Sequence, residues 1–435
     1  YNTTNYLGGT YNHNYAYDNL NRLSRATGSF SGHTKKNSVG FSEYNLDMEY
    51  NTTHGITQKK QFQTAQNGAP VYQNSYTNGY EYMPETHKVT SITNAENSTT
   101  ENFEYDANGN TIYNHNQEGF RKMYWDESNR LRVVNDNDHQ IQHYIYDGAG
   151  ERILKASSQI ETVYENGQVD ANTTTMGLYT TYVSPYMVVD ANQKYSKHYF
   201  NGTQRVASKI GEQDIAIFEN GNQYLKQANS KAAENTPSTD FDALKNKQIT
   251  DFSYYLSKST NNATAKNLKV NYTEYKKADT NTETTSAKAA DNNSAFAAPQ
   301  YAEIYYYHSD HLGTGTFLSD FDGNPYQFFL NLPFGETMAE QHSYSGDYTN
   351  RYKFNGKELD EETGFYYYGA RYYNPKFSIW LSVDPLAEKF PNWNPYNYTM
   401  QNPINLIDPT GMGPEEGGGD SPKGGVRILI NLNNT

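Results

Sequence analysis

The chain contains no cysteine and no run of eighteen apolar residues. The lack of cysteine excludes disulfides and thiolate metal sites. It leaves the compartment open, because large secreted repeat proteins often have none. The lack of a long apolar run excludes a transmembrane helix. We therefore expect neither a covalent cross-link nor a membrane span.

Apolar residues are also scarce. Only 35% of the 435 residues are hydrophobic and the mean hydropathy is -0.94, yet 42 residues are tyrosine. Tyrosine, threonine and asparagine suit strands on a wet surface, since the phenol ring packs against neighbours while its hydroxyl stays solvated. A single sheet with two wet faces would have this composition, and a thick apolar sandwich would not.

Basic residues are outnumbered. The 35 basic and 49 acidic side chains give a net charge of -14, without a basic stripe. This balance argues against nucleic acid as a partner. The chain begins at Tyr1 with neither a methionine nor a signal peptide, so we expect a fragment of a longer protein.

A short phrase recurs: an aromatic residue, an aspartate, then turn formers. It begins at Tyr17, Tyr105, Trp125 and Tyr146, and the last three lie 20 and 21 residues apart. Two strands of about 6 to 8 residues plus two turns occupy this length. The aspartate can accept hydrogen bonds from backbone N–H groups of the turn, and glycine can supply the positive φ. Each unit is predicted to be a β-hairpin, so residues 1–226 form a long antiparallel ribbon.

The hairpin pattern lapses over residues 227–299, where alanine, asparagine, threonine, serine and lysine dominate. Such a composition buries too little apolar surface to offset its ordering entropy. It predicts a low-complexity insertion, partly mobile and looped out of the ribbon, with a short helix over 240–247 as one option. Strands resume near residue 300. Residues 413–435 are a glycine-rich linker and the start of a variable C-terminal region.

Three polar residues invite a functional interpretation. His308 and His311 could suggest a metal site, but residues three apart on a strand point to opposite faces, which favours hydrogen-bonded structural histidines. Arg371 lies among tyrosines, and we expect it to stack on a tyrosine ring. Neither a metal nor another cofactor is predicted.

Residues 300–412 carry a series of phrases in a characteristic order. They are YHSDHLGT from Tyr307, FNGKE from Phe354, ETGFYY from Glu362, ARYYNP from Ala370, SVDP from Ser382, NPIN from Asn402 and DPTG from Asp408. Together with the tyrosine-aspartate hairpins, this region resembles the Rhs-associated core of Rhs/YD-repeat proteins.

The resemblance implies an all-β fold in which the ribbon winds into a hollow shell and the core closes one end as a plug. In that family a variable C-terminal toxin is held inside the shell, and many members cut themselves after a final Asp-Pro-x-Gly-Leu by means of paired aspartates. It therefore implies Asp384 and Asp408 as an aspartyl-type catalytic pair, with the cut between Met412 and Gly413. Without the resemblance, an Asp-Pro pair is usually a turn.

The chain departs from the family pattern at three positions. Ala387 replaces a glycine, Met412 replaces a leucine, and Ile379 stands where many members have arginine. Methionine for leucine conserves volume. Loss of an arginine at position 379 is expected to weaken the electrostatic support for an ionised aspartate and to slow or abolish cleavage.

Two functions remain open. One is the C-terminal part of an Rhs-type shell that encloses a toxin for competition between bacteria and releases it by self-cleavage. Its partners would be its own C-terminal toxin segment, and a secretion-system component or an immunity protein. The alternative is a YD-repeat adhesion or structural protein without cargo or cleavage. Either would be secreted or lie on the bacterial surface.

Overall fold

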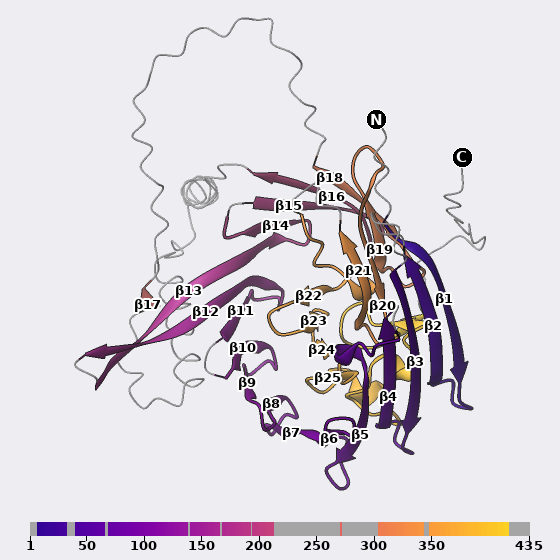
Figure 1. Cartoon of the computed structure of the whole chain (residues 1–435). Coiled ribbons are helices and arrows are strands. Elements are labelled where there is room, and N and C mark those ends of the chain that lie inside the picture. The colour runs from indigo at the N-terminus through magenta and orange to yellow at the C-terminus, as the bar shows by residue number, and fades with distance from the viewer. Residues whose placement is uncertain are drawn as a thin grey trace, which may run out of the picture.

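The structure, a computed structural model, describes residues 7–32, 40–65, 68–137, 140–165, 168–192, 194–212, 270–271, 303–342 and 348–416. Most of these residues belong to one long antiparallel meander (Figure 1). Its strands are β1 (Gly9–Tyr17), β2 (Leu23–Gly32), β3 (Gly40–Tyr50), β4 (Ile56–Ala65), β5 (Tyr76–Tyr82), β6 (Val89–Asn94), β7 (Thr99–Tyr105), β8 (Thr111–His115), β9 (Phe120–Trp125), β10 (Leu131–Asp136), β11 (Gln140–Tyr146), β12 (Arg152–Glu165), β13 (Gln168–Ser184), β14 (Met187–Asp190), β15 (Lys194–Asn201), β16 (Gln204–Glu212), β18 (Ile304–Ser309), β19 (Gly315–Ser319), β20 (Pro325–Asn331) and β21 (Thr337–His342).

Each strand pairs with the next in sequence from β1 to β16, and β16 then pairs directly with β18. In this strand pair Ala207 lies opposite Tyr306. The predicted insertion at 227–299 and its optional helix lie outside the described residues, apart from β17 (Val270–Asn271), which runs parallel to β13. The predicted antiparallel hairpin ribbon is confirmed.

The turns between the hairpins have the chemistry that the repeated phrase predicts. In each phrase one carboxylate oxygen of the aspartate accepts the N–H four residues later, at 2.8 to 3.0 Å. The residue three after the aspartate has a positive φ, 61° at Asn21 and 85° at Gly109. Asparagine and glycine tolerate this left-handed conformation best. These turns therefore depend on the short motif itself.

Aromatic residues at the last positions of β3, β5, β7, β9 and β11 join each hairpin to the preceding one, and three of them, Tyr105, Trp125 and Tyr146, begin a repeated phrase. The polar atom of each donates to a main-chain carbonyl of the neighbouring hairpin, which lets the ring pack without leaving a polar group unpaired. The pairs are Tyr50 with Leu23, Tyr82 with Ile56, Tyr105 with Val89, Trp125 with Thr111 and Tyr146 with Leu131, at 2.6 to 3.0 Å. Tyr17 differs, because its hydroxyl accepts from Asn405 of the C-terminal region.

The ribbon curls until its two ends approach each other. In Figure 1 the indigo strands β1–β4 lie beside the orange strands β19–β21. The Gly8 N–H donates to Gln341 Oε1 at 2.7 Å, and the rings of Phe30 and Phe328 stack with centroids 5.2 Å apart. Among the described strands no backbone ladder joins β1 to β21, so the curved sheet remains open.

A small second sheet lies in the concave side of the ribbon (Figure 1). It comprises β22 (Glu358–Asp360), β23 (Phe365–Tyr367), β24 (Tyr372–Asn374) and β25 (Ile379–Trp380), followed by a two-stranded pair, β26 (Leu406–Ile407) and β27 (Glu415–Glu416). Short 3-10 helices connect the parts: η1 (Tyr72–Asn74) in the ribbon, then η3 (Phe354–Gly356), η4 (Ala387–Lys389) and η5 (Thr399–Gln401). We call residues 348–416 the plug.

The ribbon is not wet on both faces where it covers the plug. Leu23 and Leu46 of the ribbon are fully buried in one apolar cluster with Tyr366 and Trp380 of the plug. The expectation of two wet faces is therefore wrong for these strands. Their apolar residues are few but alternate along each strand, so they gather on one face, and the plug's aromatic rings supply the second layer.

Candidate functional site

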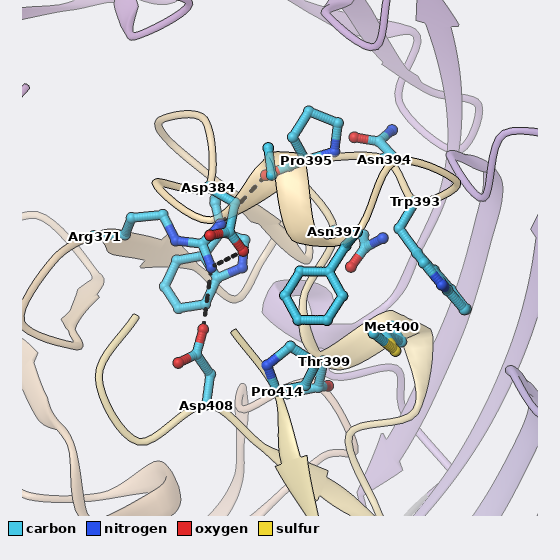
Figure 2. A pocket seen from close by; sticks show the side chains of 13 residues that line it. Arg371, Asp384, Trp393, Asn394, Pro395, Asn397, Thr399, Met400, Asp408 and Pro414 are labelled. Atoms are coloured by element: carbon cyan, nitrogen blue, oxygen red, sulfur yellow. Dashed lines mark hydrogen bonds and ion pairs between the residues drawn. The ribbon is translucent and has the colours of Figure 1, made fainter. Parts of the chain in front are cut away.

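Asp384 and Asp408 lie on either side of one arginine inside the plug (Figure 2). Arg371 Nη2 is 2.9 Å from Asp384 Oδ2 and 3.1 Å from Asp408 Oδ2. The two aspartates are 24 residues apart in the sequence, and the structure brings both to the same nitrogen atom. A guanidinium shared in this way attracts two carboxylates that would otherwise repel each other.

Arg371 is held from several directions. It directly precedes β24, and its side chain is 2% exposed. The guanidinium carbon lies 4.1 Å from the ring centroid of Trp380. Nε donates to the Gly411 carbonyl at 2.5 Å, and Nη1 donates to the Pro395 carbonyl at 3.3 Å. The planar fork is therefore fixed in position before any reaction.

Asp384 shapes a turn with one carboxylate oxygen and remains partly exposed. Its Oδ1 accepts the N–H of Leu386 at 2.8 Å, and its own N–H donates to the Pro395 carbonyl at 3.2 Å. Its side chain is 11% exposed. The turn that an Asp-Pro pair usually makes is thus present here, while Oδ2 faces Arg371.

Asp408 is more deeply buried, with a side chain 2% exposed. Oδ1 accepts N–H groups from Gly411 at 2.7 Å and from Met412 at 3.1 Å, and Oδ2 accepts the N–H of Gly413 at 3.2 Å. Burial raises the pKa of this carboxyl, against the opposing effects of Arg371 and the backbone N–H donors. Its protonated form is therefore favoured more than in an exposed aspartate.

A small cavity of about 20 Å³, enough for about one water molecule, lies beside these groups (Figure 2). Asp384 and Asp408 both line it, as do Phe390, Trp393 and Pro414. The two carboxylates therefore border a space that solvent can enter, although both are largely buried.

Sequence comparison connects the chain to bacterial toxins, although no family model matches it. Toxin subunit YenC2 of Yersinia entomophaga is 45% identical over 85 residues, 19% of this chain and 8% of that protein. The tRNA nuclease WapA of Bacillus subtilis is 35% identical over 111 residues, 25% of this chain and 5% of that protein. Toxin protein Tse5 of Pseudomonas aeruginosa is 34% identical over 117 residues, which are 26% of this chain and 8% of that protein. The chain thus spans a small fraction of these relatives.

Solved structures share the fold. The crystal structure of TcdB2-TccC3-TEV superposes with a TM-score of 0.53 at 17% identity, over 92% of this chain and 15% of that one. A Tc holotoxin pore of Photorhabdus luminescens has the same TM-score and identity, over 93% of this chain and 15% of that one. These findings support the resemblance of the chain to Rhs-type proteins. The all-β fold expected from the resemblance is therefore confirmed.

The two Asp-Pro motifs differ in how strictly the backbone requires glycine as their fourth residue. Gly411, in the second Asp-Pro motif, has φ +75°, and a Cβ there would lie 3.0 Å from the backbone nitrogen of Arg371. Glycine is needed at this position. Ala387, at the equivalent position of the first motif, begins η4 in a conformation open to any residue. The alanine therefore introduces no backbone strain.

The positive charge of the site comes from Arg371, which the sequence did not predict to contact the two aspartates. Ile379 is 6% exposed and pairs with Asn374 within the small sheet, so it contributes packing. Arg371 supplies the charge, and the ring that it covers is the indole of Trp380 rather than a tyrosine. A signal was present: Arg371 is the only charged residue between Glu362 and Lys376. A lone arginine in aromatic surroundings needs carboxylates once it is buried.

The two histidines make hydrogen bonds. His308 Nε2 lies 3.0 Å from Ser319 Oγ, and His311 Nε2 donates to the Ile404 carbonyl at 2.9 Å. Within the described ranges, no cluster of histidines and carboxylates could hold a metal ion. The same ranges contain no helix with the length and apolar character to span a membrane.

Proposed function

We propose that this chain is the C-terminal part of an Rhs-type shell that encloses a toxin segment following the plug. The support is the identity to proteins named as toxins and a ribbon that curves around the plug. We propose further that the protein is secreted or exposed on the bacterial surface. Its partners are its own C-terminal toxin segment, together with a secretion-system component or an immunity protein.

We also propose that the plug cuts its own chain between Met412 and Gly413. One observation carries this proposal: Asp408 Oδ2 contacts both Arg371, which Asp384 shares, and the N–H of Gly413. The nitrogen of Gly413 is the leaving group if the Met412–Gly413 peptide bond breaks. A carboxyl group is thus within hydrogen-bond distance of the atom that must receive a proton.

The aspartates then have separate roles. Asp384, held 2.9 Å from Arg371, acts as the base that takes a proton from a water in the pocket, and the resulting hydroxide adds to the carbonyl carbon of Met412. Asp408, protonated, passes its proton to the Gly413 nitrogen once that nitrogen becomes tetrahedral. The C–N bond breaks and leaves a carboxyl group on Met412 and an amine on Gly413. Two carboxyls in different environments commonly divide acid and base work in this way.

The pH dependence follows from the direction of the pKa shift. Burial raises the pKa of Asp408, so its protonated, active form persists to higher pH than in an exposed aspartate. The rate is expected to fall as the pH rises through that raised pKa. Activity is therefore expected to be lost, on the alkaline side of its pH profile, at a higher pH than for an exposed aspartic acid.

Intact-mass measurement on the purified chain tests the cleavage. The expected product lacks the 23 residues after Met412, and Asp384→Asn or Asp408→Asn should slow its formation by about a hundredfold or more. Asp322→Asn is the control, because Asp322 is an exposed turn residue in the ribbon. A wild-type chain that stays intact, or Asp384→Asn and Asp408→Asn chains that are cut at the wild-type rate, would exclude the protease.

The enclosure of a toxin needs a separate experiment. Protease added to the natural full-length product should digest an enclosed C-terminal segment more slowly than the same segment expressed alone. Equal digestion rates would favour the adhesion or structural alternative.

A further inference from the structure

The residues that directly follow the proposed cut are seated on the plug. Gly413 donates its N–H to Asp408, and Pro414 lines the pocket. The next two residues form β27, in which Glu415 pairs with Ile407 and Glu416 pairs with Leu406 of β26. Four successive residues on the leaving side therefore each have a defined place.

The place of Gly413 disfavours a side chain. A Cβ at this position would lie 3.2 Å from Cε2 and 3.6 Å from Cζ of Phe390. The φ of Gly413 is +152°, a conformation that residues with a side chain rarely adopt. Both the ring of Phe390 and the backbone conformation therefore select glycine.

The pocket that Pro414 lines is bordered by a strained backbone segment and by buried polar atoms. Thr399 and Met400 line it, and with Gln401, which follows them, they have φ values of 45°, 51° and 60°. Three successive non-glycine residues in this region store strain of the kind found at binding sites. Thr399 Oγ1 and Trp380 Nε1 are buried without a hydrogen-bond partner in the described part of the chain. Proline suits such a pocket because it has no N–H of its own to satisfy.

We propose that Phe390 and this pocket form a recognition subsite for the two residues after the cut, Gly413 and Pro414. This inference rests on the proposed self-cleavage and deepens it. Phe390 is the specificity-determining residue: it holds the chain at position 413 so that the leaving nitrogen stays on Asp408. A side chain at position 413 displaces that nitrogen, and a displacement near 1 Å can cost about a hundredfold in rate.

A double-mutant comparison of cleavage rates tests the subsite. Gly413→Ala should slow cleavage about ten- to a hundredfold in the otherwise wild-type chain. In a Phe390→Ala background the same substitution should slow cleavage by a factor about ten times smaller, because the ring that the new methyl group would contact is absent. Gly148→Ala is the control, since a Cβ there has no neighbour within 4 Å. An equal cost in both backgrounds, or no cost at all, would overturn the role of Phe390.

A second readout does not need cleavage. In an Asp384→Asn chain, the backbone amide at position 413 should be protected from hydrogen exchange. Protection should be lost with Gly413→Ala and partly regained when Phe390→Ala is added. If the wild-type chain is never cut but exchange follows this pattern, self-cleavage is wrong and the subsite stands. If the wild-type chain is cut but Gly413→Ala changes neither the cleavage rate nor the hydrogen-exchange protection at position 413, the subsite is wrong and self-cleavage stands.

Discussion

A second buried cation lies near the site. Lys357 donates its Nζ to the carbonyl of Pro409, next to Asp408, and lies 5.3 Å from the ring centroid of Tyr368. Burial lowers its pKa to about 8, with Asp408 opposing the shift. Arg371 keeps its charge under the same conditions because a guanidinium does not titrate in this range. The two cations therefore respond differently to pH.

Lys357→Met should reveal this titration. The folded pKa of Lys357 lies below the unfolded value, so the folded state binds fewer protons between about pH 8 and 10.5. The unfolding free energy of the wild type relative to the variant should therefore rise with pH across this window, by up to about 3 kcal/mol. Urea unfolding of both chains at pH 7 and pH 10 measures it. If the difference in unfolding free energy between the two chains does not change with pH, the lowered pKa of Lys357 is contradicted. Ionisation of tyrosines at pH 10 affects both chains equally and so cancels in this difference.

At the scale of elements, the hairpins are joined by aromatic residues at the ends of strands, among them Tyr105 of the repeated phrase. Tyr105 donates to the Val89 carbonyl at 3.0 Å and so links β7 to the start of β6. The neighbouring aspartate shapes its own turn, whereas the aromatic side chain reaches back across the preceding hairpin. The two halves of the phrase thus act at different distances along the ribbon.

Tyr105→Phe should lower the unfolding free energy by about 1 to 2 kcal/mol, since it leaves the Val89 carbonyl without its donor while keeping the ring. Tyr186→Phe is the matched control, because Tyr186 is 59% exposed and should change stability by less than about 0.5 kcal/mol. Chemical denaturation measures both. Equal effects would show that the hydroxyl of Tyr105 does not join the hairpins.

At the scale of the whole molecule, a buried ionic cluster ties the plug to the ribbon. Arg152 of β12 is 2.7 Å from both Glu358 and Asp360 of β22, and Lys155 is 3.0 Å from Asp360. Arg152 and Lys155 hold the pKa of Asp360 below its ordinary value, against the opposing effect of burial. The plug is thus bound both by apolar packing and by fully desolvated charges.

Arg152→Met should leave two buried carboxylates without their main partner and cost about 3 to 5 kcal/mol. Arg25→Met is the control: its 3.6 Å pair with Asp47 is exposed and should contribute less than about 1 kcal/mol. Urea unfolding followed by tryptophan fluorescence is informative, because Trp380 and Trp393 lie in the plug. Similar losses for the two variants would argue that the cluster does not anchor the plug.

The hairpins could be predicted because their determinants are local. Asp126 and Asn129 lie three residues apart and shape one turn, and Asp408 with Gly411 shapes another. The mistaken expectation of a wet sheet came from counting apolar residues without their partner surface. Leu23 and Trp380 are 357 positions apart yet belong to one cluster, and composition does not encode such contacts.

By itself the sequence determined the all-β ribbon and its turn positions, because hydrogen bonds within four or five residues and strand periodicity decide them. Asp384 and Asp408 were singled out by the resemblance to a family, since local chemistry alone predicts only a turn at each Asp-Pro pair. Only the tertiary structure decided that Arg371 joins Asp384 to Asp408 and that Phe390 faces Gly413. These contacts form where loops from separate parts of the plug converge. Burial then makes the shared charge strong, since water no longer screens it.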